Sequence, residues 1–230
     1  MRKLSRRHKE NVEKTKNKIY SNLEEAIQTI KETATAKFVE SVEFHANLNI
    51  DPKYADQQLR TTVTLPHGIG KQVKIAVLTN EENFDEAIDA SADIIGNEEL
   101  IENITKGIIN FDLLIATPNM MPKLAKLGRV LGPKGLMPSP KSGTVTNTLR
   151  ATLTDFKKGK FEYKADKTGV VHVTIGKVNF TENQLLDNLQ ALYNSIEKNR
   201  PSGVKGKYFK SLFLSTTMGP SIKLDLTSFV

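Results

Sequence analysis

The sequence contains no cysteine and no tryptophan among its 230 residues. Without cysteine the chain has no disulfide, no thiolate nucleophile and no cysteine-ligated zinc site, which is consistent with a reducing compartment. Residues 1–20 lack the apolar core of a secretory signal, and no later apolar run is long enough to span a membrane. Because Glu10 and Glu13 come early, a transit peptide is not indicated either. We therefore expect a soluble chain in its mature or unprocessed form.

Acidic residues are missing from the stretch between Leu113 and Thr154, although the whole chain contains 26 of them. The net charge is +7 and the isoelectric point is about 9.4. A basic balance favours an anionic partner, either nucleic acid or an acidic membrane surface. The clustering of the charge indicates a phosphate-binding surface more strongly than its total does. The cations of the acid-free stretch are Lys123, Lys126, Arg129, Lys134, Lys141 and Arg150.

Inside the acid-free stretch, residues 128–138 combine glycine and proline with apolar and cationic side chains. Glycine reaches positive φ at low cost and proline fixes φ, so we predict a rigid, irregular loop. The loop contains no Gly-Lys-Ser/Thr of a phosphate-binding loop, and the spacing of Gly128, Gly132 and Gly135 does not match a dinucleotide fingerprint. Turn chemistry alone fits a plain connection between a helix and a strand equally well.

The two ends of the chain carry helix and strand patterns. Ser21 and Glu24 predict a capping box for a helix over residues 21–35, and Thr181 and Gln184 predict a second box before a leucine-rich stripe that reads as core. The basic N-terminal segment is typical of an arm that becomes ordered on an anionic partner. Even spacing predicts strands over residues 38–48, 59–65, 161–163, 171–175, 208–217 and 222–226.

The middle of the chain alternates strands with helices. Apolar runs predict buried strands over residues 73–78 and 112–116, and helical faces follow in residues 84–91 and 100–104. Asn119 is a candidate cap for a further helix that has Pro122 in its first turn and continues to Gly128. Such alternation is typical of parallel βαβ units in a small doubly wound sheet.

A nucleotide-dependent enzyme built on this βαβ unit is the alternative to a binding protein. It would need a phosphate loop after its first strand, where residues 79–82 instead bring two acids that repel phosphate. The four histidines, His8, His45, His67 and His172, are widely separated, and no Ser-His-Asp set is evident. We expect no catalysis, no metal site and no cofactor. A membrane-surface protein is a third class, but it would need a cationic amphipathic helix with aromatic residues, which the sequence lacks.

Two segments resemble signatures of a ribosomal family, that of large-subunit protein one, the universal "L-one" stalk protein. Residues 127–138 and 140–146 match the first signature without a gap, and Ser139 stands where family members often carry Asn. Residues 215–221 resemble the carboxy-terminal signature. Further matching segments are Arg6-Arg7, Asp51-Pro52, residues 65–71, residues 173–177 and Phe180-Thr181.

The resemblance implies a two-domain α/β fold of the α+β kind. A discontinuous RNA-binding domain would comprise residues 1–66 plus 160–230, and a Rossmann-like doubly wound domain would be inserted at residues 67–159. The turn-forming clusters near Pro66 and Gly159 fall where the chain should cross between the domains.

The resemblance also implies a structural constituent of the large ribosomal subunit that is monomeric when free. Its expected partners are the mobile stalk helices of large-subunit rRNA, the exit-site tRNA whose movement it assists, other large-subunit components and, for a translational repressor, its own mRNA. The composition favours the cytoplasmic ribosome of a bacterium or the ribosome of the plastid stroma.

The second signature has the chemistry of an RNA-binding turn. Its hydroxyls, exposed thioether and close-approach glycine suit the wide, shallow minor groove of RNA and its 2′-hydroxyls. Phe38 fits an RNA contact and a core position equally well, and the polar side of residues 171–176 also fits a plain solvent face. We expect the basic arm, Lys37 and the loop at residues 205–210 to position the RNA. The predicted RNA-binding residues are Lys37, Phe38, His172, Thr174, Gly176, Lys177, Thr216, Thr217, Met218, Gly219 and Pro220, and the predicted second loop facing RNA or tRNA contains Arg129, Gly132, Lys134, Gly135 and Lys141.

Overall fold

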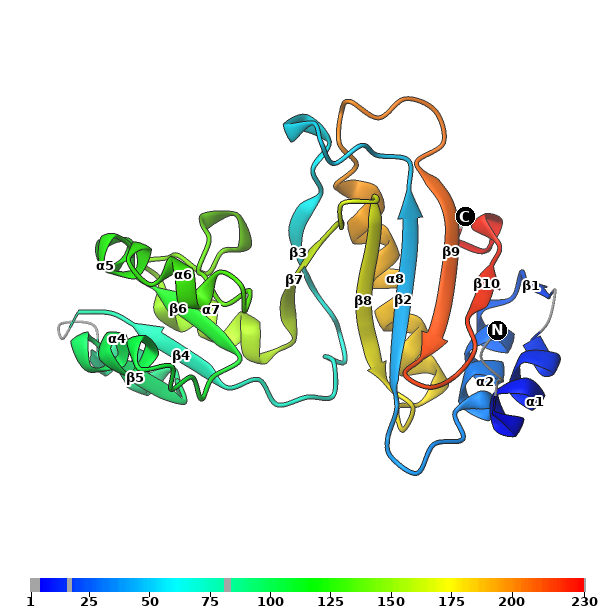
Figure 1. Ribbon diagram of the computed structural model, residues 1–230, viewed down its shortest axis with the longest axis horizontal. Helices are drawn as coiled ribbons and strands as arrows, with labels where there is room; N and C mark the ends of the chain where they lie inside the picture. Colours follow the sequence, from blue (N-terminus) through cyan, green and yellow to red (C-terminus); the bar gives the residue numbers. More distant parts are fainter. Residues whose placement is uncertain (1–4, 16–17, 81–83, 230) are drawn as a thin grey trace. The chain divides into compact units, whose positions relative to one another are not determined.

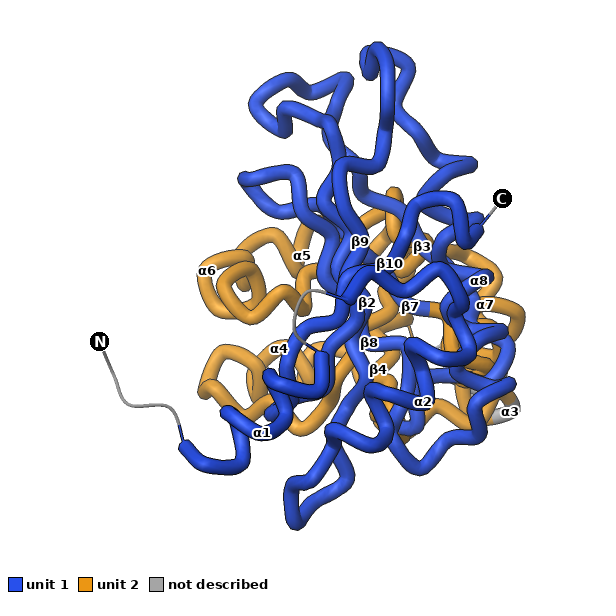
Figure 2. The backbone as a smooth tube through the Cα atoms, turned by 90° about the vertical axis from the view of Figure 1, so that its right-hand side faces the viewer, with its two compact units in different colours: residues 1–70, 161–230 blue, residues 71–160 orange. Residues whose placement is uncertain are grey.

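A computed structural model describes residues 5–15, 18–80 and 84–229, apart from the side chains of residues 85, 86 and 89. The chain forms two compact units, one made of residues 1–70 with 161–230 and the other of residues 71–160 (Figure 2). We call them the split unit and the inserted unit. That each is a domain able to fold alone stays a prediction. Across the described ranges, no helix is both long enough and apolar enough to cross a membrane.

The split unit is built on a five-stranded sheet in the order β1-β10-β9-β2-β8 (Figure 1). Its short edge strand β1 pairs in parallel with β10, and the other neighbours are antiparallel. The two chain ends and the segment after the insertion therefore meet in one sheet. The strands are β1 (Ile19–Tyr20), β2 (Ser41–Leu48), β8 (Val170–Lys177), β9 (Phe209–Thr216) and β10 (Ile222–Leu224), and a separate pair is formed by β3 (Arg60–Thr64) and β7 (Lys160–Lys164).

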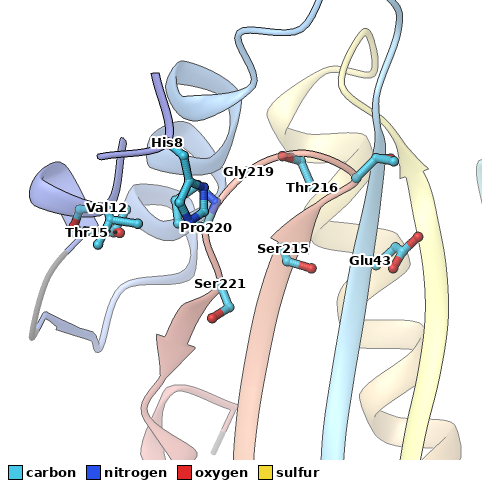
Figure 3. A pocket seen from close by; sticks show the side chains of 10 residues that line it. His8, Val12, Thr15, Glu43, Ser215, Thr216, Gly219, Pro220 and Ser221 are labelled. Atoms are coloured by element: carbon cyan, nitrogen blue, oxygen red, sulfur yellow. Dashed lines mark hydrogen bonds between the residues drawn. The ribbon is translucent and has the colours of Figure 1, made fainter. Parts of the chain in front are cut away.

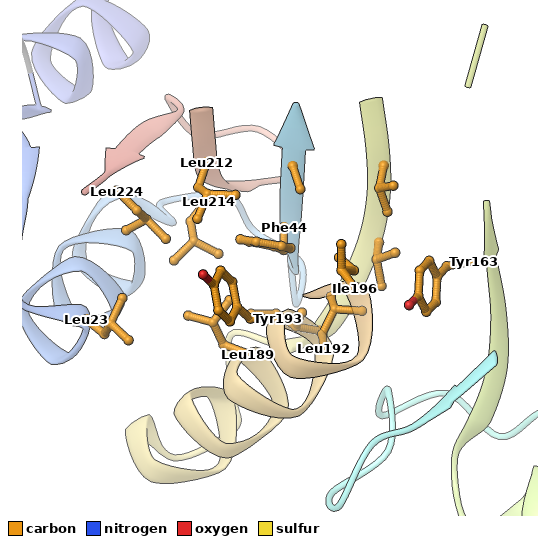
Figure 4. Packing of buried hydrophobic residues seen from close by; sticks show 14 of the residues in the cluster. Leu23, Phe44, Tyr163, Leu189, Leu192, Tyr193, Ile196, Leu212, Leu214 and Leu224 are labelled. Atoms are coloured by element: carbon orange, nitrogen blue, oxygen red, sulfur yellow. The ribbon is translucent and has the colours of Figure 1, made fainter. Parts of the chain in front are cut away.

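One face of this sheet is packed and the other is open. On β2 the side chains of Val42, Phe44, Ala46 and Leu48 are buried, as the even spacing predicted. Helices α2 (Leu23–Thr33) and α8 (Glu182–Lys198) cover that face, where the leucine stripe of α8 packs beneath Phe44 (Figure 4). Because side chains alternate along each strand, the intervening residues, which are polar apart from one phenylalanine, point away from this core. We call them the open face: Glu43, His45 and Asn47 of β2, His172 and Thr174 of β8, and Ser211, Phe213 and Ser215 of β9.

The N-terminal segment is more ordered than predicted. It forms helix α1 (Arg6–Thr15), which is attached to the end of α2 because the buried Asn11 side chain donates from Nδ2 to the carbonyl of Thr33 at 2.8 Å. The predicted capping box at Ser21 is wrong, since Asn22 caps α2 by accepting from the backbone N–H of Glu24. The second box is confirmed: Thr181 and Gln184 cap α8 reciprocally.

The inserted unit has the predicted parallel sheet, in the order β5-β4-β6. Its strand β5 was not predicted, because three residues are too short for a periodic pattern. Two separate apolar clusters cover the two faces of the sheet. The α/β class is thus confirmed. The elements are β4 (Ile75–Leu78), α3 (Phe84–Asp89), β5 (Ile94–Gly96), α4 (Glu98–Thr105), β6 (Leu113–Ala116), η3 (Pro118–Met120), α5 (Met121–Ala125), α6 (Gly128–Leu131), η4 (Pro140–Ser142) and α7 (Leu149–Lys157).

Candidate nucleic-acid interface

A buried carboxylate joins the two predicted RNA-contacting segments of the split unit. Glu40 is 2% exposed, and its two carboxylate oxygens accept hydrogen bonds from the backbone N–H groups of Ala36 at 3.1 Å and Met218 at 2.8 Å. Its backbone carbonyl accepts from Val178 at 3.0 Å, just after β8. Hydrogen bonds to a charged acceptor are the strong ones. Glu40 therefore fixes the loop before β2, the turn after β9 and the end of β8 relative to one another.

Three large apolar side chains around this carboxylate face solvent. Phe38 is 56% exposed, Val39 is 55% exposed and Met218 is 51% exposed. We call them the apolar ledge. Of the two interpretations of Phe38, the structure supports the exposed one, because its ring is outside the core. An aromatic ring and a thioether held on a rigid turn can lie against bases or sugars without needing hydrogen bonds.

The turn after β9 leaves little space for larger residues. Thr217 accepts the backbone N–H of Ser41 at 3.0 Å, which ties the turn to β2. The hydroxyl of Thr216 is buried and has no hydrogen-bond partner among the described residues. A Cβ on Gly219 would lie 2.3 Å from that hydroxyl oxygen, so only glycine fits there without movement. Thr216 and Gly219 are both predicted RNA contacts, but the buried Thr216 hydroxyl supports the turn from beneath.

The predicted residues of β8 lie on different sides of the sheet. His172 and Thr174 belong to the open face, and Lys177 donates from Nζ to the hydroxyl of Ser41 at 2.8 Å. Gly176 does not face the same way, because a Cβ at this position would meet Leu185 Cδ2 at 2.9 Å. Its glycine is required by packing against α8.

The open face brings together histidines that the sequence separates, which corrects the expectation that they are scattered. The Nδ1 atoms of His45 and His172 are 2.8 Å apart, so one ring donates to the other. Nε2 of His45 lies 2.9 Å from the hydroxyl of Ser215, and Nε2 of His172 lies 3.8 Å from Asp166. Burial lowers the pKa of His45, and a positive charge on His172 lowers it further. The Glu43 carboxylate, 3.8 Å from His45, opposes both effects.

The contact between Ser215 and His45 does not form a hydrolytic centre. Ser215 lies inside β9, where it pairs with Glu43 of β2 in the sheet ladder. An oxyanion hole needs free, converging N–H donors beside the nucleophile. No group of three metal-ligating side chains occurs in the described ranges. The chemistry on offer is hydrogen bonding and stacking.

Sequence reasoning missed several open-face residues. Glu43 pairs with Ser215 and Thr174 on the neighbouring strands, and His45 pairs with Phe213. The signal was present, because these residues alternate with the buried positions of β2 and β9. An isolated aromatic such as Phe213, out of phase with the core positions, indicates a binding face rather than packing.

A hollow of about 630 Å³ lies between α1 and the turn after β9 (Figure 3). It includes the open-face residues Glu43 and Ser215 in its lining, together with Thr217 and Gly219 on either side of Met218 in the turn. Figure 3 shows His8 on the α1 side and Glu43 on the strand side, with Ser215 between them. The ten lining residues are His8, Val12, Thr15, Glu43, Ser215, Thr216, Thr217, Gly219, Pro220 and Ser221.

Two groups of cations predicted to position RNA lie in the split unit. The exposed cations of α1 and Lys37 lie at the end of the sheet that carries the turn. The basic loop at residues 205–210 precedes β9, so it lies at the opposite end of that strand from the turn. This loop was expected to position the same RNA as the turn. The structure separates the two by the length of β9.

The predicted second loop lies in the inserted unit. It begins as the helical turn α6, so it is less irregular than expected, and Gly135 has a left-handed φ of 72°. Gly132 has φ −59°, but a Cβ there would lie 2.6 Å from the carbonyl oxygen of Gly128. The predicted Asn119 cap is wrong, since α5 begins after Met120. Among the described residues, no ion pair involves the three cations at the centre of the prediction, which are all exposed: Arg129, Lys134 and Lys141.

Comparison with known proteins shows which protein family this chain resembles. A family model described as the ribosomal protein L1p/L10e family matches residues 30–220. The chain is 78% identical over 229 residues to the large ribosomal subunit protein uL1c of Phaeodactylum tricornutum, covering 100% of both chains. It is 57% identical to uL1c of Guillardia theta, covering 100% of this chain and 97% of that one. It is also 57% identical to large ribosomal subunit protein uL1 of Prochlorococcus marinus, covering 99% and 97%.

Proposed function

The chain belongs to the ribosomal protein L1p/L10e family, and on that premise we propose that its split unit binds the stalk helices of large-subunit rRNA. At the coarser level, the chain is a structural constituent of the large ribosomal subunit and not an enzyme, and its ribosome is of the plastid or bacterial type. Binding of rRNA is general for this family.

The observation that carries the proposal is the arrangement around Glu40. This buried carboxylate holds the apolar ledge and the turn in one rigid constellation beside the polar open face. Rigid presentation reduces the entropy lost on binding, which improves affinity without new contacts. An irregular but fixed surface of hydroxyls, a thioether and an aromatic ring is suited to RNA, whose minor groove offers shape and 2′-hydroxyls.

We assign different roles to charge and shape in this interface. Lys37 and the cations of α1 neutralise phosphates and supply affinity for any RNA, with a salt dependence of roughly 0.7–0.9 per contact. Thr217, Met218 and the open-face residue Thr174 supply the preference for one RNA shape. Replacing a cation should therefore weaken the binding of all RNAs alike, and replacing a residue of the turn should weaken only the binding of the preferred RNA.

The finer roles concern tRNA and mRNA. We assign the contact with departing exit-site tRNA to the inserted unit, because Arg129, Lys134 and Lys141 are exposed in an acid-free loop. A hairpin in the chain's own message that copied the stalk shape would compete for the same turn and would thereby allow repression. Repression needs the stalk site to be read by shape, so it depends on the proposal above, whereas the tRNA contact depends on the cations of the inserted unit.

The test compares a purified rRNA stalk fragment with an unrelated duplex of equal length. Thr217→Ala and Met218→Ala should each weaken the stalk complex by about 5- to 30-fold, the scale of 1–2 kcal/mol, and leave duplex binding unchanged. Thr64→Ala is the matched control, because Thr64 is exposed on β3 outside the site. An equal loss of affinity for both RNAs, or no loss for either, would show that the turn does not recognise the stalk.

A further inference from the structure

The hollow beside the turn carries a more specific inference, which rests on the proposed function. Its volume of about 630 Å³ lies in the roughly 300–1,000 Å³ range typical of small-molecule sites. It is formed by α1 on one side and by β2, β9 and the turn on the other, all within the split unit (Figure 3). A plain groove for an RNA backbone would need cations along its wall.

The wall of the hollow carries the opposite charge. Glu43 is the only acid among the described residues that line it, and the Nε2 atom of His45 lies 3.8 Å from the Glu43 carboxylate. Burial and His172 lower the pKa of His45, which favours the neutral ring and weakens its compensation of the carboxylate. A free carboxylate repels phosphate and accepts hydrogen bonds from N–H donors. The hollow is therefore suited to a neutral group with N–H donors, set inside a surface that otherwise attracts RNA.

Other groups around the hollow are also free to bind. Among the described residues, neither the ring of His8 nor the hydroxyl of Ser221 has a hydrogen-bond partner. Val12 and Pro220 add apolar surface to the lining. This combination matches an unstacked base, which needs a flat apolar contact or a ring such as histidine and polar groups at its edge.

We propose that the hollow receives one unpaired base of the bound RNA, and that Glu43 selects guanine. The Watson–Crick edge of guanine offers two adjacent N–H donors, from the ring N1 and the exocyclic amino group, which a carboxylate accepts in a bidentate manner. Adenine and cytosine offer one amino group each, and uracil offers a single ring N–H. His8 of α1 then stacks on the base or bonds its far edge.

The test uses short single-stranded probes, so that it does not depend on stalk recognition. The three RNA pentamers are UUGUU, UUIUU and UUAUU. The inosine of UUIUU lacks the exocyclic amino group of guanine. Binding is followed by the NMR signals of His8, Gly219 and Ser221 in the full chain. A good bidentate pair discriminates by about 1–3 kcal/mol, so UUGUU should bind about tenfold more tightly than the other two.

Variants assign the preference to the carboxylate. Glu43→Gln should abolish the discrimination, and the matched control Glu32→Gln, an exposed acid on α2, should keep it while changing net charge equally. Ser221→Ala provides a second variant, which should reduce affinity for all three pentamers without removing the guanine preference. Equal binding of the three pentamers by the wild-type chain would overturn the proposal, as would a guanine preference that survives in Glu43→Gln.

The two proposals fail in different ways. If the chain prefers the stalk fragment over duplex but shows no preference among pentamers, only the base pocket is wrong. If the pentamers are discriminated as predicted but the stalk fragment binds no better than duplex, the pocket stands and stalk recognition is wrong.

Discussion

Replacing Glu40 by glutamine removes the element that organises the interface and hardly changes its shape. The carboxylate accepts one backbone N–H from Ala36 and one from Met218, at 3.1 and 2.8 Å. The amide of glutamine has one acceptor oxygen, so its NH₂ group must face one of these N–H donors. One charge-assisted bond is lost, the other becomes neutral, and one partly buried N–H is left without its protein partner.

The size of the effect follows from these losses. A hydrogen bond to a charged group contributes about 1.5–3 kcal/mol, and an unpaired buried donor costs about 1–3 kcal/mol. Part of this is offset because a buried charge is no longer desolvated. We expect Glu40→Gln to lower the free energy of unfolding of the split unit by roughly 2–4 kcal/mol. Glu32→Gln, which removes an exposed charge, should stay within about 0.5 kcal/mol of the wild type.

Two assays read the result. Urea unfolding followed by circular dichroism gives the change in stability, and titration with the stalk fragment gives the affinity under conditions where the variant is folded. The folded variant should lose its preference for the stalk fragment over duplex, because the apolar ledge and the turn are no longer held together. Wild-type stability together with a wild-type stalk preference would refute the role assigned to Glu40.

Three further predictions follow from particular contacts. Gly219→Ala should destabilise the split unit by about 1–3 kcal/mol through overpacking against the Thr216 hydroxyl, and adding Thr216→Ala should recover most of the loss in a double-mutant cycle; simple additivity would contradict the close contact. The folded state lowers the pKa of His45 below its ordinary 6.5, so the stability that His45 provides is present above pH 6.5 and is lost as the pH falls. His45→Asn should therefore flatten the fall in melting temperature between about pH 7 and pH 5, and an unchanged slope would contradict this role of His45. Deleting residues 71–160 and joining the ends with a short Gly-Ser linker should leave a folded unit that still binds the stalk fragment, and loss of cooperative unfolding would show that the two units are not separate domains.

Local patterns predicted the parts of the fold that depend on short-range physics. Alternation of apolar residues gave the strands, since a half-buried strand has a period of two, as in residues 42–48. The Thr181 box was predictable because a cap and its partner lie within four residues. The Ser21 box failed because the neighbouring Asn22 can cap the same helix, and sequence alone does not decide between adjacent polar residues.

The features that organise the interface depend on contacts between distant residues. Glu40 and Met218 are 178 positions apart, and His45 and His172 are 127 apart, so no local pattern joins them. Helix α1 was missed because its stability comes from docking through Asn11 and not from its own sequence. The signature turn was predictable as a binding site, and the buried acid that supports it was not.

The most direct test of the account is a hydrogen-exchange footprint of the full chain with and without the stalk fragment. We predict that binding slows amide exchange in residues 36–41, in residues 172–177 and in residues 215–221, and leaves residues 128–143 of the inserted unit unchanged. Protection centred on residues 128–143, with none around Glu40, would place the stalk on the inserted unit and contradict the central claim.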